Sequence, residues 1–584
     1  MKTATEKRKI SRGTLKRVLS YVKKYPLSLA FTLLFSAITV AFTLYIPVLI
    51  GDGIDRIAGV GKVDFAALKK IFVKIGLSLS VAAVSQWLSS VLNNRLAFHV
   101  VEDMRREAFQ KLHALPLAYL DTHPRGDTLS RIVSDAEQFA DGLLMGFTQF
   151  FTGALTILGT IGFMFAMSWK IALVVLFVTP ASLLVARYIA THTHTFFTRQ
   201  AEIRAEQTAF TEEMISGLKT VQAYAREDEN GEKFREIDER LKKASLDATF
   251  YSSLVNPSTR FVNNLVYALV ALIGALGIIQ GGFTVGGLTK FLAYANQYTK
   301  PFNEISGVVA ELQNALVCAS RIFELLDETE EESDEDGKIL SCADGEVGLE
   351  EVSFSYNPEN PLIERLNLQV GKGKKVAIVG PTGSGKTTLV NLLMRFYETT
   401  GGSITVDGLD VKNLTRKSLR SQYGMVLQDT WIKDGTVKDN IRLGKSNATD
   451  EEIVKAAKAA HAHGFIKRLE KGYETRLSED GGGLSQGQKQ LLCIARIMLS
   501  LPPMLILDEA TSSIDTRTEK KIGEAFDLLM QGRTSFIVAH RLSPIRSADV
   551  ILVMNGGKVV EQGTHTELLA KKGFYHQLYQ SQFA

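Results

Sequence analysis

The sequence predicts a multi-domain chain in which an all-α six-helix transmembrane domain is followed by an α/β domain of the P-loop class. Three observations support this prediction. Long uncharged runs are confined to the first half of the chain, a glycine-rich motif lies in the second half, and an acidic stretch separates them. Average properties conceal this contrast, because an apolar half and a charged half combine to a mean hydropathy of +0.05.

Composition alone excludes several classes of protein. A chain of 584 residues with 45% hydrophobic content can bury a sizeable core and is not disordered. Its 47 glycines and 13 prolines exclude a collagen-like or low-complexity chain. A net charge of +4 gives no sign of nucleic-acid binding. The three scattered cysteines, Cys318, Cys342 and Cys493, predict neither a disulfide framework nor a zinc site.

The first half contains uncharged runs of membrane-spanning length. Residues 27–51 are long enough for a helix that crosses a bilayer and too long for a signal-peptide core. Four more such runs lie at residues 75–94, 142–169, 171–186 and 261–289. Glycines at 280–287 predict a break between two helices. The helix after the break, about 285–312, is polar for a span and contains Lys290 and Glu304. We therefore expect five clear spans and a weaker sixth.

The N-terminus predicts the orientation of these spans. Nine Lys and Arg residues precede residue 25 against one acidic residue, and the positive-inside rule places such a segment in the cytoplasm. Leu15, Val18, Leu19 and Val22 recur with helical spacing, which predicts a basic amphipathic helix on the inner membrane surface. A mitochondrial targeting segment is the alternative, because it is also basic and amphipathic.

Six spans make the charged segments 95–137 and 187–260 cytoplasmic and return the chain to the cytoplasm near residue 312. The acidic stretch that follows, residues 327–336, predicts a solvated linker, because like charges repel and resist packing. We place the transmembrane domain at residues 1–326, the linker at 327–345 and the second domain at 346–584.

A P-loop lies near the start of the second domain. Residues 374–390 combine a buried-strand pattern, a loop that fits G-x-x-x-x-G-K-[ST] and the start of a helix. Backbone N–H groups of such a loop close on phosphates, Lys386 supplies charge to the β and γ oxygens, and the Thr387 hydroxyl is placed to ligate Mg²⁺. The motif predicts ATP and Mg²⁺ as ligands, and a five-span topology would place the site away from cytoplasmic ATP. We assign to the phosphate cradle Gly380, Thr382, Gly383, Ser384, Gly385, Lys386, Thr387 and Thr388.

Two further apolar runs end in groups with catalytic chemistry. Residues 504–508 end in Asp508, which a strand beside the P-loop would deliver to Mg²⁺, and Glu509 follows near the γ-phosphate, able to orient or deprotonate water. Residues 535–539 run into His540, and a lone histidine at a strand end is also consistent with a structural role.

The motif at residues 483–488, Gly-Leu-Ser-Gln-Gly-Gln, resembles the LSGGQ signature of ATP-binding cassette (ABC) proteins. With it, the order of motifs is similar to the family across the second domain, and the spans resemble the exporter branch. The chain looks like an ABC exporter half-transporter. The resemblance implies ATP hydrolysis that drives alternating access in a multi-pass protein of the plasma (inner) membrane, with the N-terminus and the ATPase domain in the cytoplasm.

The resemblance implies roles for residues around the ATP. Tyr356 matches the aromatic residue that stacks on adenine. Gln428 matches the glutamine that contacts Mg²⁺ and water, and so joins Thr387 and Asp508 as a metal ligand. His540 matches the switch histidine at the γ-phosphate, which makes Glu509, His540 and Gln428 the catalytic set.

The resemblance also implies a two-chain site. Asp515 matches a loop that faces the partner domain. Ser485 and Gly487, with Gln488, would grip the γ-phosphate of ATP held by the opposite subunit. Two half-transporters would then have to pair. Short coupling helices near residues 116–125 and 211–223 would dock on the ATPase domains, where Glu479 resembles the acidic residue that meets them.

The sequence departs from the family pattern at Gln486, where glycine is usual, and in the run 491–493. The signature and the residues that follow it resemble those of one half of the bacterial heterodimeric multidrug exporters. Because Glu509 and His540 are intact, we expect the glutamate-bearing half of a heterodimer, and a homodimer is the alternative. The expected partners are a second half-transporter, membrane lipids and a small hydrophobic or amphipathic substrate, without nucleic acid. An ATP-gated channel or receptor is the alternative from another class, and an intact Glu509 disfavours it.

Overall fold

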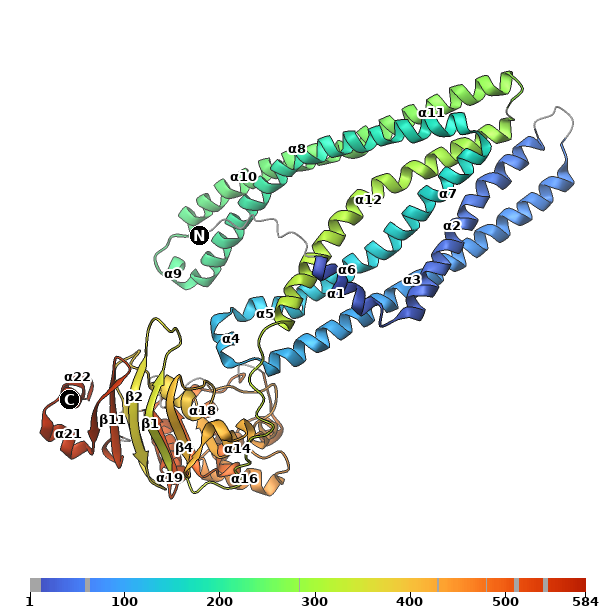
Figure 1. Cartoon of the computed structure of the whole chain (residues 1–584). Helices are drawn as coiled ribbons and strands as arrows, with labels where there is room; N and C mark the ends of the chain where they lie inside the picture. Colours follow the sequence, from blue (N-terminus) through green and yellow to red (C-terminus); the bar gives the residue numbers. More distant parts are fainter. Residues whose placement is uncertain are drawn as a thin grey trace. The chain divides into compact units, whose positions relative to one another are not determined.

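The computed structural model describes residues 12–57, 63–282, 284–427, 430–478, 481–508, 514–538 and 545–583. Two compact units divide the chain (Figure 1). The helical unit comprises Met1–Ala114 and His123–Thr329. The second unit, called the ATPase unit after the activity that its motifs predict, comprises Leu115–Thr122 and Glu330–Ala584. This division falls inside the predicted linker and assigns a short segment of the first half to the second unit. The boundaries 1–326, 327–345 and 346–584 remain predictions.

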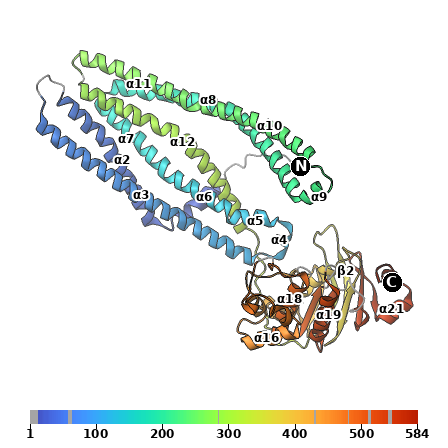
Figure 2. The ribbon, with the colours of Figure 1, turned by 180° about the vertical axis from the view of Figure 1, so that it is seen from behind.

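Long helices make up the helical unit, and in Figure 2 α8 runs beside α10 and α11. The helices of this unit are α1 (Arg12–Val22), α2 (Pro26–Asp55), α3 (Phe65–Ala114), α5 (Arg125–Ile132), α6 (Ser134–Met145), α7 (Phe151–Met167), α8 (Trp169–Ser216), α9 (Leu218–Ala223), α10 (Glu227–Ser253), α11 (Val255–Ile279) and α12 (Val285–Leu326). A π-helical turn at Gly146–Phe150 joins α6 to α7 and interrupts the run predicted at 142–169. Among the described residues, α2, α3 and the α10–α11 run are long and apolar enough to cross a membrane, and α7 is a shorter apolar helix.

The predicted break before the sixth span is present, between Ile279 and Val285. The polar start of α12 is tied to the end of α2: the Gly286 amide donates to Asp55 at 2.7 Å, and Lys290 pairs with Asp52 at 2.5 Å. The pair with Asp52 neutralises Lys290, one of the charges that made this helix an unconvincing span.

The apolar stripe of the N-terminal helix α1 is partly buried against protein, whereas the prediction placed it on the membrane surface. Val18 and Val22 are buried, whereas Leu15 and Leu19 stay 47% and 44% exposed. An ion pair also holds the helix within its unit: Arg17 lies 2.6 Å from Asp327, which directly follows α12. The stripe is therefore divided, and only its exposed part is free for a membrane surface.

The ATPase unit is built around two main sheets. A six-stranded sheet has the order β12-β11-β3-β10-β9-β6, and a four-stranded antiparallel sheet has the order β2-β1-β4-β5. The strands are β1 (Val347–Phe354), β2 (Ile363–Val370), β3 (Lys375–Val379), β4 (Gly401–Val406), β5 (Leu409–Asp410), β6 (Tyr423–Val426), β7 (Gly435–Thr436), β8 (Arg476–Leu477), β9 (Met504–Asp508), β10 (Thr534–Val538), β11 (Val550–Asn555) and β12 (Lys558–Gly563). This is the predicted α/β fold class.

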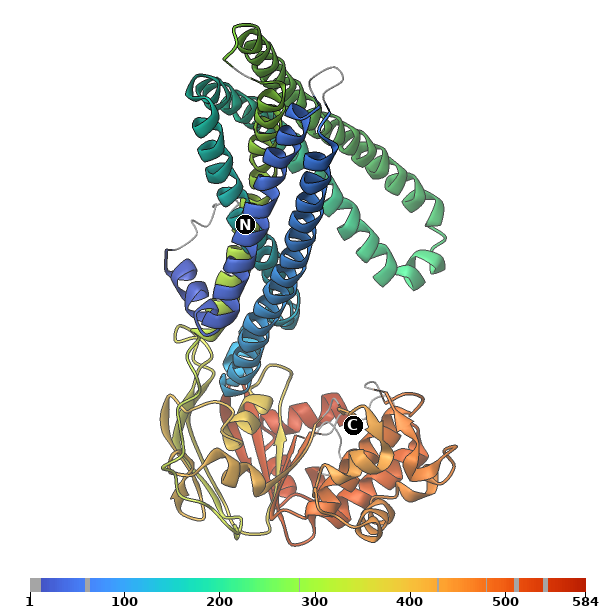
Figure 3. The same cartoon turned by 90° about the vertical axis from the view of Figure 1, so that its right-hand side faces the viewer.

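Helices complete the ATPase unit, and Figure 3 shows the orange ones gathered at one side of it. They are α4 (Leu117–Thr122), α13 (Lys386–Leu393), α14 (Arg416–Ser421), α15 (Val437–Arg442), α16 (Asp450–Ala459), α17 (His463–Ile466), α18 (Gln486–Ser500), α19 (Thr516–Met530), α21 (His565–Lys571) and α22 (Phe574–Phe583). Strands β3, β9 and β10 are buried along nearly their whole length, as expected of parallel strands covered on both faces.

The acidic linker is not solvated throughout, contrary to the prediction. The Arg416 side chain, 7% exposed, lies 3.0 Å from Glu331 and 3.0 Å from Glu398, and its backbone N–H donates to Asp334. Two more arginines, Arg395 and Arg420, lie beside this cluster. Repulsion among the acidic residues is therefore offset by cations from the folded unit, and the segment docks on α14.

Candidate nucleotide-binding site

The P-loop lies between β3 and α13, in a backbone conformation that requires glycine. Gly383 and Gly385 have φ values of +80° and +96°, and Gly385 begins the helix. A Cβ at Gly380 would lie 2.2 Å from the Met554 carbonyl oxygen on β11. Successive N–H groups in such a loop, at a helix N-terminus, form a cradle for an anion.

Lys386 closes this cradle. Its side chain is 8% exposed, and Nζ donates to the carbonyl oxygens of Gly380 at 2.9 Å and Pro381 at 3.0 Å. Burial lowers the pKa of the Lys386 ammonium, and the nearby Asp508 carboxylate opposes that shift. Among the described residues its hydrogen-bond acceptors are neutral carbonyl groups, so this buried ammonium attracts an anionic ligand.

Ser384 offers a second sign that a ligand belongs here. It is buried, and its hydroxyl has no hydrogen-bond partner among the described residues. Since buried hydroxyl groups are normally paired, this orphaned Oγ fits a phosphate oxygen as its missing partner. The residues present therefore fit the phosphates of a nucleoside triphosphate.

An aromatic cluster lies beside the P-loop helix, at the residue predicted to stack on adenine. Tyr356 is 53% exposed, and its Oη lies 3.2 Å from Thr388 Oγ1, within the P-loop helix. Its ring meets Phe354 and Tyr397 edge-on, at centroid distances of 4.9 and 5.1 Å. An exposed face on a braced ring is suited to stacking. Thr382, on the loop, and Thr387, in the first turn of α13, are exposed.

The predicted catalytic groups follow strands that end at one edge of the sheet. Val538 on β10 is paired with Asp508 on β9 and with Ile378 on β3, and all three strands are parallel. Asp508 therefore lies at the P-loop edge. Glu509, His540 and Gln428 lie outside the described residues, as does Glu479.

The signature residues form a second cluster. Ser485 caps α18, accepting from the Gln488 amide at 3.3 Å, and its own amide donates to Gln488 Oε1 at 3.0 Å. Asp515 caps α19 and accepts from the Thr518 amide at 2.9 Å, which lowers the pKa of its carboxyl. Gly487 is buried between these helices. Within the described ranges, no hydrogen bond or ion pair joins this cluster to the P-loop.

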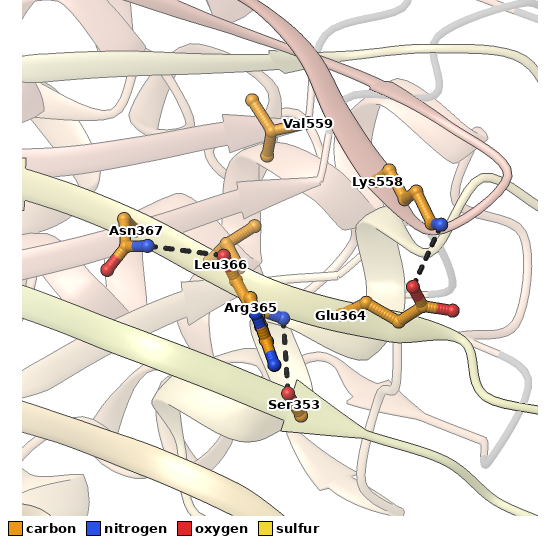
Figure 4. A pocket seen from close by; sticks show the side chains of 7 residues that line it. All are labelled: Ser353, Glu364, Arg365, Leu366, Asn367, Lys558 and Val559. Carbon is orange, nitrogen blue, oxygen red and sulfur yellow. Dashed lines mark hydrogen bonds and ion pairs between the residues drawn. The ribbon is translucent and has the colours of Figure 1, made fainter.

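A surface hollow of about 560 Å³ between β1, β2 and β12 contains none of these residues (Figure 4). Its polar groups already pair with one another. Lys558 lies 2.8 Å from Glu364, and the Arg365 amide donates to Ser353 Oγ at 3.1 Å. We assign it no ligand.

Comparison with known proteins identifies the chain. The family described as ABC transporter transmembrane region matches residues 29–302, and the family described as ABC transporter matches residues 363–512. The chain belongs to the ABC transporter family. It is an ABC exporter half-transporter with both regions fused, and its ATPase domain hydrolyses ATP to drive transport.

Relatives of this ABC exporter cover almost all of it. A fatty acid ABC transporter ATP-binding/permease protein of Mycobacterium tuberculosis is 43% identical over 90% of this chain and 83% of its own length. A Staphylococcus aureus ATP-binding/permease protein, provisionally named for multidrug export, is 35% identical over 97% of this chain and 100% of its own. A bacterial Atm1-family ABC exporter solved with ATP bound superposes with a TM-score of 0.78 at 27% identity, over 96% and 99% of the two chains.

The ABC exporter fold confirms the predicted fold class, and ABC exporters work as dimers. Short helices are present inside both segments predicted to couple the domains: α4 within 116–125 and α9 within 211–223. Sequence reasoning missed Tyr397 and Asp121. The Tyr397 hydroxyl donates to the Asp121 carboxylate, across a separation of 276 residues that no local pattern could reveal.

Proposed function

We propose that this chain exports small amphipathic molecules, lipid-like or drug-like, across the plasma membrane as the glutamate-bearing half of a heterodimer. Fatty acids are the first substrate candidate, because the relative that is 43% identical is named for them. A site shared by two chains is supported above all by one observation: within the described part of one chain, no hydrogen bond or ion pair joins the signature cluster to the P-loop. The exposed α9, which buries no residue in the single chain, supports the same conclusion.

The chemistry of the proposed site follows from its residues. Lys386 and the P-loop amides hold the phosphates, Tyr356 stacks on adenine, and Thr387, Asp508 and Gln428 hold Mg²⁺. Bound Mg²⁺ supplies charge neutralisation on the phosphate oxygens.

Two further groups of residues complete the reaction. Glu509 orients or deprotonates the attacking water, and His540 holds the γ-phosphate. Residues of the other chain that correspond to the signature cluster close the site around the nucleotide.

Gln486 supports unequal sites. Its Nε2 lies 3.5 Å from Thr430 Oγ1 of the same chain, at the N-terminus of α18 where glycine is usual in the family. A side chain at this position crowds the approach of a partner's γ-phosphate. The site that this signature completes would then turn over more slowly than the site that Glu509 serves.

Affinity purification of the tagged chain from native membranes tests the pairing. We expect a second half-transporter that lacks the glutamate corresponding to Glu509. A chain that purifies alone as a dimer with full substrate-stimulated ATPase activity would exclude the heterodimer and leave the homodimer.

Transport into inverted membrane vesicles tests the substrate. We expect ATP-dependent uptake of a fluorescent fatty acid, and no uptake with Glu509→Gln. Uptake of a cationic dye without fatty acid uptake would instead favour the multidrug function for which the S. aureus relative is named. Downhill flux that persists in Glu509→Gln would identify a channel.

A further inference from the structure

The short helix α4 belongs to the ATPase unit even though it lies between two helices of the other unit in the sequence. Leu115, just before α4, and Tyr119, within it, are buried, whereas Asp121 and Thr122 at its end are exposed. Asp121, near the end of α4, accepts a hydrogen bond from the Tyr397 hydroxyl. Movements of Tyr397 therefore act directly on α4.

Tyr397 is equally close to the candidate adenine site. It follows the P-loop helix α13, and its ring meets Tyr356 edge-on with the centroids 5.1 Å apart and the planes at 88°. Phe354 braces it from another side at 5.5 Å. Edge-to-face pairs of this kind depend on ring orientation, so that fixing one ring favours a particular position of the other.

The hydroxyl of Tyr397 is a dependable donor. Burial, and then the hydrogen bond to Asp121, raise the pKa of Tyr397 well above its ordinary value. The phenol stays protonated at every physiological pH, and Asp121 keeps its partner unless the ring itself moves.

A continuous set of contacts thus leads from the phosphate cradle to α4. Thr388 lies 3.2 Å from the Tyr356 hydroxyl, Tyr356 packs on Tyr397, and Tyr397 donates to Asp121. Every residue of this set belongs to the ATPase unit. Tyr397 touches both the aromatic rings of Phe354 and Tyr356 and, through Asp121, α4.

We propose that Tyr397 is a positioning residue that reports adenine binding to α4. Adenine stacked on Tyr356 restricts that ring, the edge-on contact passes the restriction to Tyr397, and the bond to Asp121 fixes α4. This inference rests on the proposed nucleotide site. It adds that the base, and not only the triphosphate, acts on the helix that links the two units.

Hydrogen–deuterium exchange on the purified full-length transporter tests the proposal. Two peptides serve as readouts: residues 380–388 for the P-loop and 115–122 for α4. In the wild type, AMP-PNP with Mg²⁺ slows exchange in both. Inorganic tripolyphosphate, added until the P-loop peptide is equally protected, leaves α4 unchanged because it has no base.

Variants separate the relay from a role in packing. Tyr397→Phe keeps the ring and removes the donor, so the AMP-PNP effect on α4 should fall by about fivefold, as expected when one hydrogen bond of ordinary strength is lost. Protection of the P-loop should persist. Asp121→Ala should reproduce this loss, and Asp121→Asn, which keeps an acceptor oxygen, should restore part of the response.

A matched control is Tyr473→Phe, because the Tyr473 hydroxyl bonds His463 elsewhere in the ATPase unit at 2.8 Å. This variant should keep the full α4 response. The proposal is overturned if Tyr397→Phe responds like the wild type, or if tripolyphosphate alone protects α4. AMP-PNP that protects neither peptide would instead refute the nucleotide site itself.

Discussion

Thr518 on α19 occupies the space that a side chain on Gly487 of α18 would need. A Cβ built on Gly487 would lie 2.5 Å from Thr518 Cγ2 and 3.0 Å from Ile514 Cγ2. The two helices begin side by side, capped by Ser485 and Asp515. In this part of the signature, glycine is required for close packing within the chain, independently of any contact with a nucleotide.

Gly487→Ala should therefore destabilise the ATPase unit by about 1–3 kcal/mol, the usual range for overpacking. Thermal unfolding of the purified transporter measures the effect, and Thr518→Ala in the same chain should relieve it. Gly523→Ala on α19 is the matched control, since a Cβ there would meet nothing within 4 Å. Equal stability of the Gly487 and Gly523 variants would show that the clash is relieved without cost.

Ser384→Ala should weaken ATP binding by about tenfold without lowering stability. The hydroxyl has no partner among the described residues, so its removal leaves no protein group unpaired, and only the phosphate loses a donor. Binding of a fluorescent ATP analogue and thermal unfolding measure the two quantities.

Ser535→Ala is the control for Ser384→Ala. Ser535 is fully buried, and its hydroxyl donates to the Arg533 carbonyl oxygen at 3.1 Å. Its removal should lower stability by about 1 kcal/mol and leave ATP affinity unchanged. An equal loss of ATP affinity in both variants would mean that Ser384 acts only through the fold.

Features with a local cause could be predicted from the sequence. The P-loop, the apolar strands around it and the glycine break before α12 each depend on neighbouring residues, and the structure has the elements where the patterns place them. The roles of Glu509, His540 and Gln428 remain predictions.

Features that depend on distant residues could not be predicted. Charge repulsion predicts a solvated linker, but Arg416 pairs with Glu331 from 85 positions away in the sequence. The helical spacing of α1 also does not indicate which of its apolar residues are buried against protein and which stay exposed. The short helix α4 belongs to the ATPase unit, where Asp121 bonds Tyr397 from 276 positions away, so no local pattern could indicate this placement.

Arg416→Met should destabilise the ATPase unit by about 3 kcal/mol. The substitution removes the buried cation that contacts both Glu331 and Glu398, and leaves Glu398 with Arg395 and Glu331 with the more distant Arg420. Breaking one side of such a cluster is more damaging than replacing it whole. Urea unfolding measures the loss, and a glutamate-specific protease should cut within residues 330–336 faster than in the wild type.

Arg365→Met is the control for Arg416→Met. Arg365 pairs with Glu351 at 3.8 Å, but its side chain is 85% exposed, so the loss should stay below about 1 kcal/mol. Adding Glu331→Gln to Arg416→Met should recover part of the stability. If the double variant recovers no stability, the loss in Arg416→Met comes from packing and not from unpaired charge.

The stability of the ATPase unit should fall as the pH drops below about 6.5, partly because of His565. Burial, and then the charge of Arg546, lower the pKa of His565 in the folded protein. The unfolded chain recovers the ordinary pKa, so it binds protons first as the pH falls, and proton binding favours unfolding until the folded pKa is reached. The Tyr575 hydroxyl lies 2.7 Å from His565 Nδ1 and packs against the same ring.

Melting temperatures between pH 7.5 and 5.5 test the role of His565. The wild type should lose stability on acidification, and His565→Gln should flatten the slope because the titrating group is gone. Tyr575→Phe should keep most of the slope, since burial is the larger cause of the shift and the phenyl ring preserves it. A slope unchanged in His565→Gln would assign the acid sensitivity to other groups, with His463 next, because burial and two nearby lysines lower its pKa in the same direction.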